Sequence, residues 1–434
     1  MLFRHPGLHL DARHRCLEAT IVHPPVTEAA TAVVRPATTM QDGYPSTQTK
    51  HSKGETNMRK RSAAALALTA AMLFAACGSD SDGGSTTAAP AGTTATADTT
   101  APDATEAPAG TDAPAGSTPA TGGDLKLGIA YDTGGRGDGT FNDAAAAGAD
   151  KAKTDLGYTV DELEATSDED RTPNLEALTG NGDNPIIAVG FLFSDALAAI
   201  APQNPDTTYA IVDGFVDPAV APNVLNLGFA ENEGSFLVGA AAALKSETGH
   251  IGFIGGQEID LIKKFEAGYI AGAKAVNPDI VIESQYLGAA GDNAAWGSPD
   301  KAKEIALGWY ADGADVIYTA AGGSGAGTIE AAVEAGKWAI GVDSDQYLTV
   351  GDPEAQKHIL TSMLKRVDVA VYLTAEAVAK GDTSGVPAAF DLSVDGVGYA
   401  TSGGYVDDIV PQLEDFKAKI ISGEIKVPTK PEDA

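Results

Sequence analysis

From residue 125 onward, short apolar runs rich in β-branched residues alternate with Ala-rich stretches whose apolar positions recur at helical spacing. The apolar runs lack polar alternation, as in Ile251-Gly252-Phe253-Ile254, which indicates parallel strands that are buried on both faces. The predicted strands lie at 125–131, 185–191, 209–212, 224–229, 250–254, 280–286, 315–319 and 337–342, and the predicted helices at 143–156, 194–200, 231–245 and 261–276. This order predicts βαβ units and an α/β fold.

A basic tetrapeptide and a short apolar segment precede this region. Met58-Arg59-Lys60-Arg61 leads directly into residues 62–76, which end at Cys77. The apolar segment is too short to span a membrane and has the layout of a secretory signal. The small residues before Cys77 resemble a bacterial lipobox, with Phe74 where an aliphatic residue is usual, so we expect Cys77 to be lipidated. The alternative is an ordinary secreted protein that is cleaved after Ala76.

Two further segments flank the signal. Residues 1–57 show no apolar periodicity, and because an export signal lies at the start of a chain, we interpret them as the product of a translation start placed too early. The alternative is a cytoplasmic arm on a signal anchor. Residues 78–123 consist almost entirely of Ser, Thr, Ala, Pro, Gly and Asp, which predicts a flexible tether of roughly 35–40 Å between its ends. Cys77 is then the single cysteine of the mature chain, which excludes an internal disulfide.

The charge balance restricts the partners of the mature chain. Residues 1–77 contain nine Lys and Arg and five Asp and Glu, which leaves 20 basic and 55 acidic side chains in residues 78–434, a net charge of −35. Nucleic acid is excluded as a partner because phosphate contacts need a basic face. Anionic lipid is disfavoured for the same reason, so acyl chains on Cys77 are the expected membrane contact. The length of residues 124–434 suits two lobes better than one core.

Polar and glycine-rich positions follow several predicted strands, where ligands of open parallel sheets bind. Glycines allow close backbone approach, and carboxylates accept hydrogen bonds from hydroxyls or amines. A single acidic residue at such a place is more often a helix cap or turn residue, but several together indicate a site. These positions are Asp132, 134–142, Asp213, Gly255-Gly256, 322–327 and Asp343.

A short pattern occurs twice along the chain. Phe141 is followed seven residues later by Gly148-Ala149, and Phe265 is followed at the same distance by Gly272-Ala273. Each pair lies at a helix that comes after a predicted strand. The repetition indicates two lobes of one design, although Phe and Gly-Ala at one spacing also recur by chance in a chain this rich in Gly and Ala.

The strand-end segments occur in the order of a known family. They are 132–135 with 140–143, 229–237, 263–268, 313–323, 340–346 and 361–368. With these segments, residues 124–380 resemble the basic membrane lipoprotein (BMP) family of importer-binding proteins, which includes purine-nucleoside receptors. The resemblance implies a type I periplasmic-binding-protein fold of two doubly wound parallel-sheet lobes joined by three hinge crossings. We expect lobe 1 at 124–230 plus about 361–390, and lobe 2 at 231–360 plus about 391–434.

The same resemblance implies a binding site. Asp132 and Asn142 match residues that hydrogen-bond the purine, and Phe141 matches the aromatic residue that stacks on it. Asp343 and Lys365 match groups that hold the ribose hydroxyls.

Two further residues complete the candidate site. Asp213, at the end of its strand, is a candidate for the same cleft. Family members usually carry a second aromatic residue on the opposing lobe, but the matching loop at 288–299 is longer and lacks Phe. Trp296 either replaces that aromatic residue or caps a surface loop.

The expected function is that of an extracytoplasmic solute-binding lipoprotein of an ABC importer, which captures a nucleoside, purine favoured, and delivers it to an ABC permease. We expect a monomer that is lipid-anchored to the outer face of the cytoplasmic membrane and has no cofactor, metal or catalytic activity. The alternatives are a periplasmic α/β enzyme and a small-molecule sensor with the same fold.

Three motifs bear on the enzyme alternative. Asp132-Thr133-Gly134 has the sequence of an aspartic-protease tripeptide, but such a protease needs two copies and no second one is present. Residues 322–327 with Asp343 resemble a dinucleotide-binding layout, except that Thr328 stands where the third glycine is required. The only histidines after Cys77 are His250 and His358, and no cysteine lies near them at zinc spacing.

Overall fold

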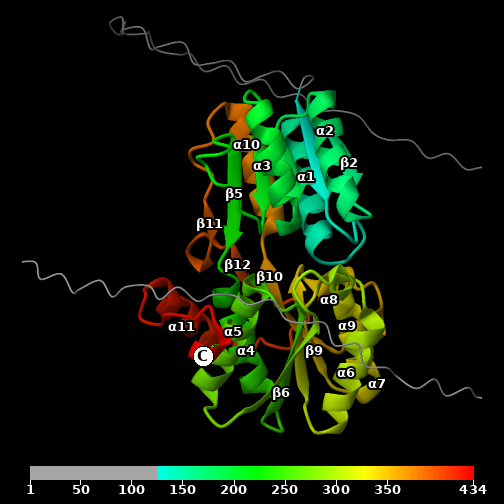
Figure 1. Cartoon of the computed structure of the whole chain (residues 1–434). Helices are drawn as coiled ribbons and strands as arrows, with labels where there is room; N and C mark the ends of the chain where they lie inside the picture. Colours follow the sequence, from blue (N-terminus) through cyan, green and yellow to red (C-terminus); the bar gives the residue numbers. More distant parts are fainter. Residues whose placement is uncertain (1–124) are drawn as a thin grey trace, which may run out of the picture. The chain divides into compact units, whose positions relative to one another are not determined.

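A computed structural model describes residues 125–434 and contains two six-stranded sheets (Figure 1). The strand orders are β11-β5-β4-β3-β1-β2 and β12-β10-β9-β8-β6-β7. The predicted α/β fold with two doubly wound, mainly parallel sheets is therefore confirmed. The predicted signal, Cys77, the tether and residues 1–57 lie outside the described residues.

All pairings within the first sheet are parallel. β3 and β4 are fully buried, as their unbroken apolar sequences predict. Its strands are β1 (Lys126–Tyr131), β2 (Thr159–Glu164), β3 (Ile186–Val189), β4 (Tyr209–Val212), β5 (Val224–Phe229) and β11 (Ala389–Phe390). Helices α1 (Phe141–Leu156), α2 (Arg171–Asn181), α3 (Ser194–Ile200) and α10 (Val367–Lys380) belong to this lobe. We call it lobe 1.

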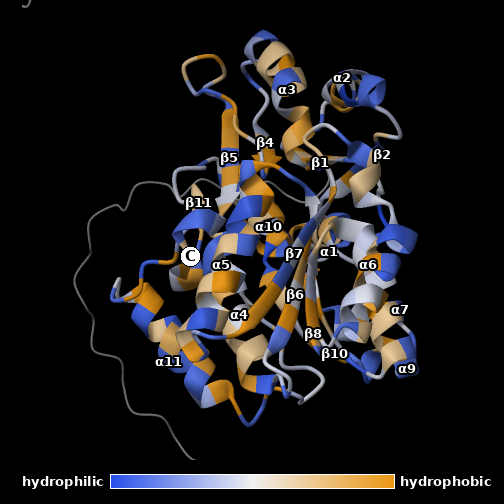
Figure 2. Cartoon of the chain, turned by 60° about the horizontal axis from the view of Figure 1, so that its bottom comes forward, coloured by the Kyte–Doolittle hydropathy of each residue, from blue (hydrophilic) through white to orange (hydrophobic). Residues whose placement is uncertain are grey.

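The second sheet is parallel except for its edge strand β12, which runs antiparallel to β10. Figure 2 shows its strands between helices α4 and α5 on one side and α6 and α7 on the other. Its strands are β6 (His250–Gln257), β7 (Val281–Gly288), β8 (Val316–Ala320), β9 (Trp338–Asp343), β10 (Ile359–Lys365) and β12 (Val397–Tyr399). Its helices are α4 (Glu231–Lys245), α5 (Asp260–Val276), α6 (Pro299–Ala311), α7 (Gly325–Ala335), α8 (Gln346–Thr349), α9 (Pro353–Gln356) and α11 (Val410–Ile421). We call this part lobe 2.

The chain passes between the two sheets three times: from β5 to α4, from β10 to α10, and from β11 to β12. In each case the preceding element belongs to one sheet and the following element packs on the other. The carboxyl ends of the parallel strands in both lobes meet near these crossings (Figure 1). Residues just after the strands of both lobes are thereby brought together.

Glycines allow helices to cross at very short range in both lobes. A Cβ atom at Gly272 in α5 would overlap the carbonyl oxygen of Phe236 in α4. A Cβ atom at Gly148 in α1 would overlap the carbonyl oxygen of Asp368 in α10. These two glycines belong to the pattern that the sequence repeats, so the repetition corresponds to the same type of helix crossing in each lobe.

One predicted loop is part of a strand. β6 continues to Gln257, so Gly255 and Gly256 lie inside the strand and not after it. Their missing side chains leave room for aromatic rings, because a Cβ atom would overlap Tyr286 at Gly255 and Trp296 at Gly256. The prediction was wrong because it ended the strand at two consecutive glycines, whereas a glycine inside a strand can mark the close approach of a neighbour. Within residues 125–434, none of the helices has both the length and the apolar character of a membrane span.

Candidate functional site

A cavity of about 250 Å³ lies between the strand ends of the two lobes. Its walls include residues from the loop after β1, from α1 and from the turn after β4 in lobe 1, and from α5, β9 and β10 in lobe 2. The structure brings all seven predicted site residues to this cavity, although they are scattered through the sequence: Asp132, Phe141, Asn142, Asp213, Trp296, Asp343 and Lys365.

Asp132 follows β1 and is held by an arginine that the sequence interpretation did not single out. Arg171, in the first turn of α2, donates from Nη2 to Asp132 Oδ1 at 2.7 Å. The backbone N–H of Thr133 donates to the same oxygen at 2.8 Å. Both side chains of the ion pair are buried. Arg171 is one of only three arginines in residues 125–434, but nothing in its local sequence indicates that it reaches Asp132.

Asp138 organises the start of α1 and orients Asn142. One of its carboxylate oxygens accepts from the backbone N–H groups of Thr140 and Asp143, at 2.9 and 3.1 Å. The other accepts from the backbone N–H and from Nδ2 of Asn142, at 2.9 and 3.1 Å. Turning the amide over would place its oxygen against a carboxylate, so Nδ2 is fixed toward Asp138.

The opposite atom of the Asn142 amide has no partner. Its Oδ1 is buried and accepts no hydrogen bond from the residues that the structure describes. A buried, unpaired acceptor costs about 1–3 kcal/mol, and a ligand that donates to it removes this cost. Burial also raises the pKa of Asp138, against which its backbone hydrogen bonds act.

Lys365 ends β10 and lies between carboxylates from both lobes. Its ammonium group hydrogen-bonds Asp213, which follows β4 in lobe 1, and lies 3.4 Å from Glu231 at the start of α4. Glu231 also accepts from Lys264 at 3.1 Å. Burial by itself would lower the pKa of Lys365, but Asp213, Glu231 and Asp343 outweigh it and raise that pKa above its usual value. Lys365 is therefore a buried cation that connects the two lobes.

Three aromatic rings surround the same ammonium group. Lys365 Nζ lies 5.3 Å from the ring centre of Phe141, 5.1 Å from that of Phe229 and 5.5 Å from that of Phe265. At these distances the negative ring faces attract a cation. Phe141 and Phe265 also line the cavity. The rings exclude water from the lysine and leave its open side toward the cavity.

Asp343 ends β9 and faces the cavity from lobe 2. Burial raises its pKa to about 7, with the positive charge of Lys365 acting in the opposite direction. Near neutral pH this carboxyl group is therefore present both with and without its proton. It can accept a hydrogen bond in one form and donate one in the other.

Trp296 closes the cavity from lobe 2. It is the last residue of the short 3₁₀ helix η4 (Asn293–Trp296), is partly buried, and packs against Gly256 in β6. Trp296 was predicted either to replace the missing second aromatic residue or to cap a surface loop. The structure places it in the wall of the cavity. In the part of the chain that the structure covers, no group of three or more His, Cys, Asp or Glu is arranged to hold a metal ion.

Comparisons with known proteins agree on one group. The family model Bmp, described as ABC transporter substrate-binding protein PnrA-like, matches residues 126–431. A CD4+ T-cell-stimulating antigen of Listeria monocytogenes is 37% identical over 328 residues, which cover 71% of this chain and 89% of that protein. The ABC transporter nucleoside-binding protein BmpA of Lactococcus lactis is 36% identical over 330 residues, which cover 71% and 90%.

One solved structure has a similar fold. The solute-binding protein of an ABC transporter system from Aeropyrum pernix K1 superimposes with a TM-score of 0.61 at 29% identity, covering 70% of this chain and 94% of that one.

Proposed function

Because the chain belongs to the Bmp family of PnrA-like ABC transporter substrate-binding proteins, we propose that it binds a nucleoside, purine favoured, in the cavity between its lobes and delivers it to an ABC permease. The observation that carries the proposal is the chemistry of the cavity lining. It combines aromatic rings and buried hydrogen-bond acceptors with a buried ammonium group beside a carboxyl group.

The aromatic and hydrogen-bond-accepting residues of the cavity suit a flat, nitrogen-rich base. Phe141 and Trp296 come from opposite lobes and both line the cavity, so each offers a ring face to a bound base. Stacking on an aromatic side chain contributes about 1–3 kcal/mol per base. Asp132 and Asn142 also line the cavity, and their carboxylate and amide oxygens can accept from ring or exocyclic N–H groups.

The carboxyl group and the ammonium group of the cavity suit a ribose. Asp343 and Lys365 supply a carboxyl group and an ammonium group, which together can accept from and donate to neighbouring hydroxyls. Hydrogen bonds to such charged groups contribute about 1.5–3 kcal/mol each. Asp213 pairs with Lys365, so we propose that Asp213 fixes the lysine and that the lysine contacts the sugar. The name of the lactococcal relative, a nucleoside-binding protein, supports this assignment.

Calorimetry on the detergent-solubilised full chain tests the ligand. The protein is stripped of bound ligand by unfolding and refolding, and is then titrated with inosine, adenosine, cytidine and ribose. We expect the purine nucleosides to bind more tightly than cytidine, and ribose to bind most weakly. If the refolded protein has its native circular dichroism but binds none of the four at millimolar concentration, the nucleoside assignment is wrong.

The membrane attachment is part of the same proposal and rests on the sequence before Cys77. We propose that the chain is exported, lipidated at Cys77 and held as a monomer at the outer face of the membrane, with no catalytic activity. In detergent phase partitioning, Cys77→Ala should leave the detergent phase or remain unprocessed. A variant that is cleaved and still partitions with detergent contradicts the lipid anchor.

A further inference from the structure

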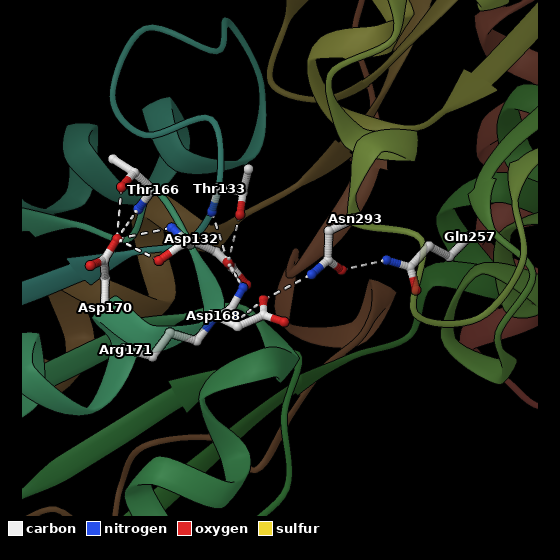
Figure 3. A network of polar contacts seen from close by, with 9 residues as sticks. Asp132, Thr133, Thr166, Asp168, Asp170, Arg171, Gln257 and Asn293 are labelled. Carbon is white, nitrogen blue, oxygen red and sulfur yellow. Dashed lines mark hydrogen bonds and ion pairs between the residues drawn. The ribbon is translucent and has the colours of Figure 1, made fainter.

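A chain of polar contacts runs from the cavity across the boundary between the lobes (Figure 3). It begins with the pair Asp132 and Arg171. Arg171 Nη1 also donates to Asp168 Oδ1 at 2.7 Å. That same oxygen accepts from Asn293 Nδ2 at 3.0 Å, and Asn293 Oδ1 accepts from Gln257 Nε2 at 2.9 Å. Five side chains thus form one continuous path.

The path crosses from one lobe to the other at a single hydrogen bond. In lobe 1, Asp168 opens the short 3₁₀ helix η1 (Asp168–Asp170) and Arg171 begins α2. In lobe 2, Gln257 ends β6 and Asn293 opens η4. We call the contact between Asp168 and Asn293, with Gln257 behind it, the clasp. Gln257 is itself fixed, because its Oε1 accepts from the backbone N–H of Gly291 at 2.8 Å.

Both ends of the path adjoin the cavity wall. On the lobe 1 side, Arg171 holds Asp132, which lines the cavity. On the lobe 2 side, Asn293 and the cavity-lining Trp296 belong to the same four-residue helix η4. Opening the clasp therefore separates η4, which carries Trp296, from Arg171, which holds Asp132 on the opposite side of the cavity.

Burial divides the path into a strong part and a weak part. The side chains of Arg171 and Asp132 are 6% and 13% exposed, whereas that of Asp168 is 72% exposed. The buried ion pair persists when the lobes separate, since breaking it would leave a charge without water or partner. The contact between Asp168 and Asn293 is exposed to water, where one hydrogen bond contributes little, so it can open and close readily.

The turn before α2 holds Arg171 where its two terminal nitrogens reach Asp168 and Asp132. Asp170 accepts through one carboxylate oxygen from the backbone N–H groups of Thr166 and Ser167, at 2.9 Å each (Figure 3). This capped turn fixes Asp168, which lies inside it, and Arg171, which follows it. Only a guanidinium group has separate nitrogens in one rigid plane that can bind two carboxylates at once.

We propose that Arg171 is a positioning residue that orients Asp132 toward the ligand and links this orientation to closure of the lobes through the clasp. Ligand can leave only after the clasp opens. The proposal rests on the proposed function in that the cavity must hold a ligand, but the clasp itself is a property of the ligand-free chain as well.

A second pair of contacts between the lobes provides a matched control. Ser344 Oγ donates to the carbonyl oxygen of Thr140 at 2.7 Å, and Thr349 Oγ1 donates to that of Gly139 at 3.0 Å. These bonds also join lobe 2 to lobe 1, but they end on backbone atoms and have no charged path to Asp132. Ser344→Ala therefore removes a bond between the lobes without touching the clasp.

Stopped-flow tryptophan fluorescence with inosine, on the full chain in detergent, tests the clasp. Asn293→Ala should raise the dissociation rate about three- to tenfold and leave the association rate and the melting temperature of the ligand-free protein unchanged. Asp168→Ala should act similarly, and the double variant should dissociate no faster than either single variant. Combining Ser344→Ala with Asn293→Ala should multiply the two effects.

The link to Asp132 has its own readout. In the Arg171→Lys variant, the single ammonium group cannot bind both carboxylates. Asn293→Ala should therefore raise the dissociation rate less than half as much in this variant as in the wild type. Multiplicative effects of Asp168→Ala and Asn293→Ala, or a full effect of Asn293→Ala beside Arg171→Lys, would overturn the proposal.

Hydrogen exchange of the ligand-free chain separates this inference from the nucleoside assignment. Asn293→Ala should speed exchange at 166–172 and 290–297 but not at 139–143, whichever ligand the protein binds. Failure of the wild type to bind inosine then counts against the proposed function alone. Unchanged exchange in the first two segments counts against the clasp.

Discussion

Asp213 and Asp343 occupy matching positions in the two lobes. Asp213 follows β4 and Asp343 ends β9, each at the fourth strand of its lobe in chain order. Both have left-handed backbone conformations, with φ of 63° and 64°, which residues other than glycine rarely adopt. Both line the cavity beside Lys365. Residues in such conformations concentrate at functional sites, so the two lobes present a matched pair of carboxyl groups to one buried lysine.

The raised pKa of Asp343 predicts a pH dependence of stability. The carboxyl group loses its proton near its usual pKa of 3.8 in the unfolded chain, but at about 7 in the folded chain. Between these values the folded state binds more protons, so the free energy of unfolding falls as pH rises and the loss is complete above about pH 7. Asn does not titrate. The free energy of unfolding of Asp343→Asn, relative to that of the wild type, should therefore rise by roughly 1–3 kcal/mol between pH 5 and pH 8.

Urea unfolding at the two pH values measures this difference. Asp312→Asn is the control, because it removes an exposed carboxylate from the same lobe. Parallel pH profiles for wild type and Asp343→Asn would show that the carboxyl group is not perturbed by burial.

The buried pair of Lys365 and Asp213 predicts an asymmetric response to substitution. Lys365→Met leaves Asp213 buried without its cation and leaves Glu231 with Lys264 alone, which should cost about 3–5 kcal/mol. Adding Asp213→Asn removes the uncompensated charge and should restore part of that loss. Denaturant unfolding of the wild type, both single variants and the double variant measures the coupling. Additive losses would mean that the two side chains do not interact.

Much of the fold follows from the sequence because buried parallel strands are continuously apolar. The predicted strands at 209–212 and 224–229 and the predicted helix at 231–245 coincide with β4, β5 and α4. β2 was missed because it is an edge strand whose sequence, Thr-Val-Asp-Glu-Leu-Glu, is largely polar and incompletely buried. Apolar patterning does not detect such a strand.

The candidate site was predictable where a residue's place along its own strand determines its position. Asp132, Asp213 and Asp343 all follow or end strands whose carboxyl ends meet, so strand order alone brings them together. Arg171 and Glu231 act through contacts with residues far away in the sequence. No local pattern specifies those contacts, because they depend on how α2 and α4 pack.

The close helix crossing at Gly272 predicts a contrast between two Gly→Ala substitutions. A methyl group at Gly272 would overlap the carbonyl oxygen of Phe236, so Gly272→Ala should force α4 and α5 apart and cost about 1–3 kcal/mol. Gly308 in α6 has open space around the same atom, and there Ala should stabilise the helix by about 0.4–1 kcal/mol. Thermal unfolding should therefore shift in opposite directions. A stabilised Gly272→Ala variant would contradict the helix packing.

The aromatic lining of the cavity predicts that the loss of affinity caused by Phe141→Ala depends on the ligand. Phe141→Ala removes a stacking face and should weaken inosine binding by about 1–3 kcal/mol, roughly ten- to hundredfold. Free ribose has no base to stack, so its affinity should change much less. Phe215→Ala is the matched control, because this phenylalanine is also in lobe 1 but is 68% exposed and does not line the cavity. Calorimetry with both ligands on both variants gives the contrast. An equal loss for inosine and ribose would mean that Phe141 supports Lys365, whose ammonium group lies over its ring, and does not hold the base.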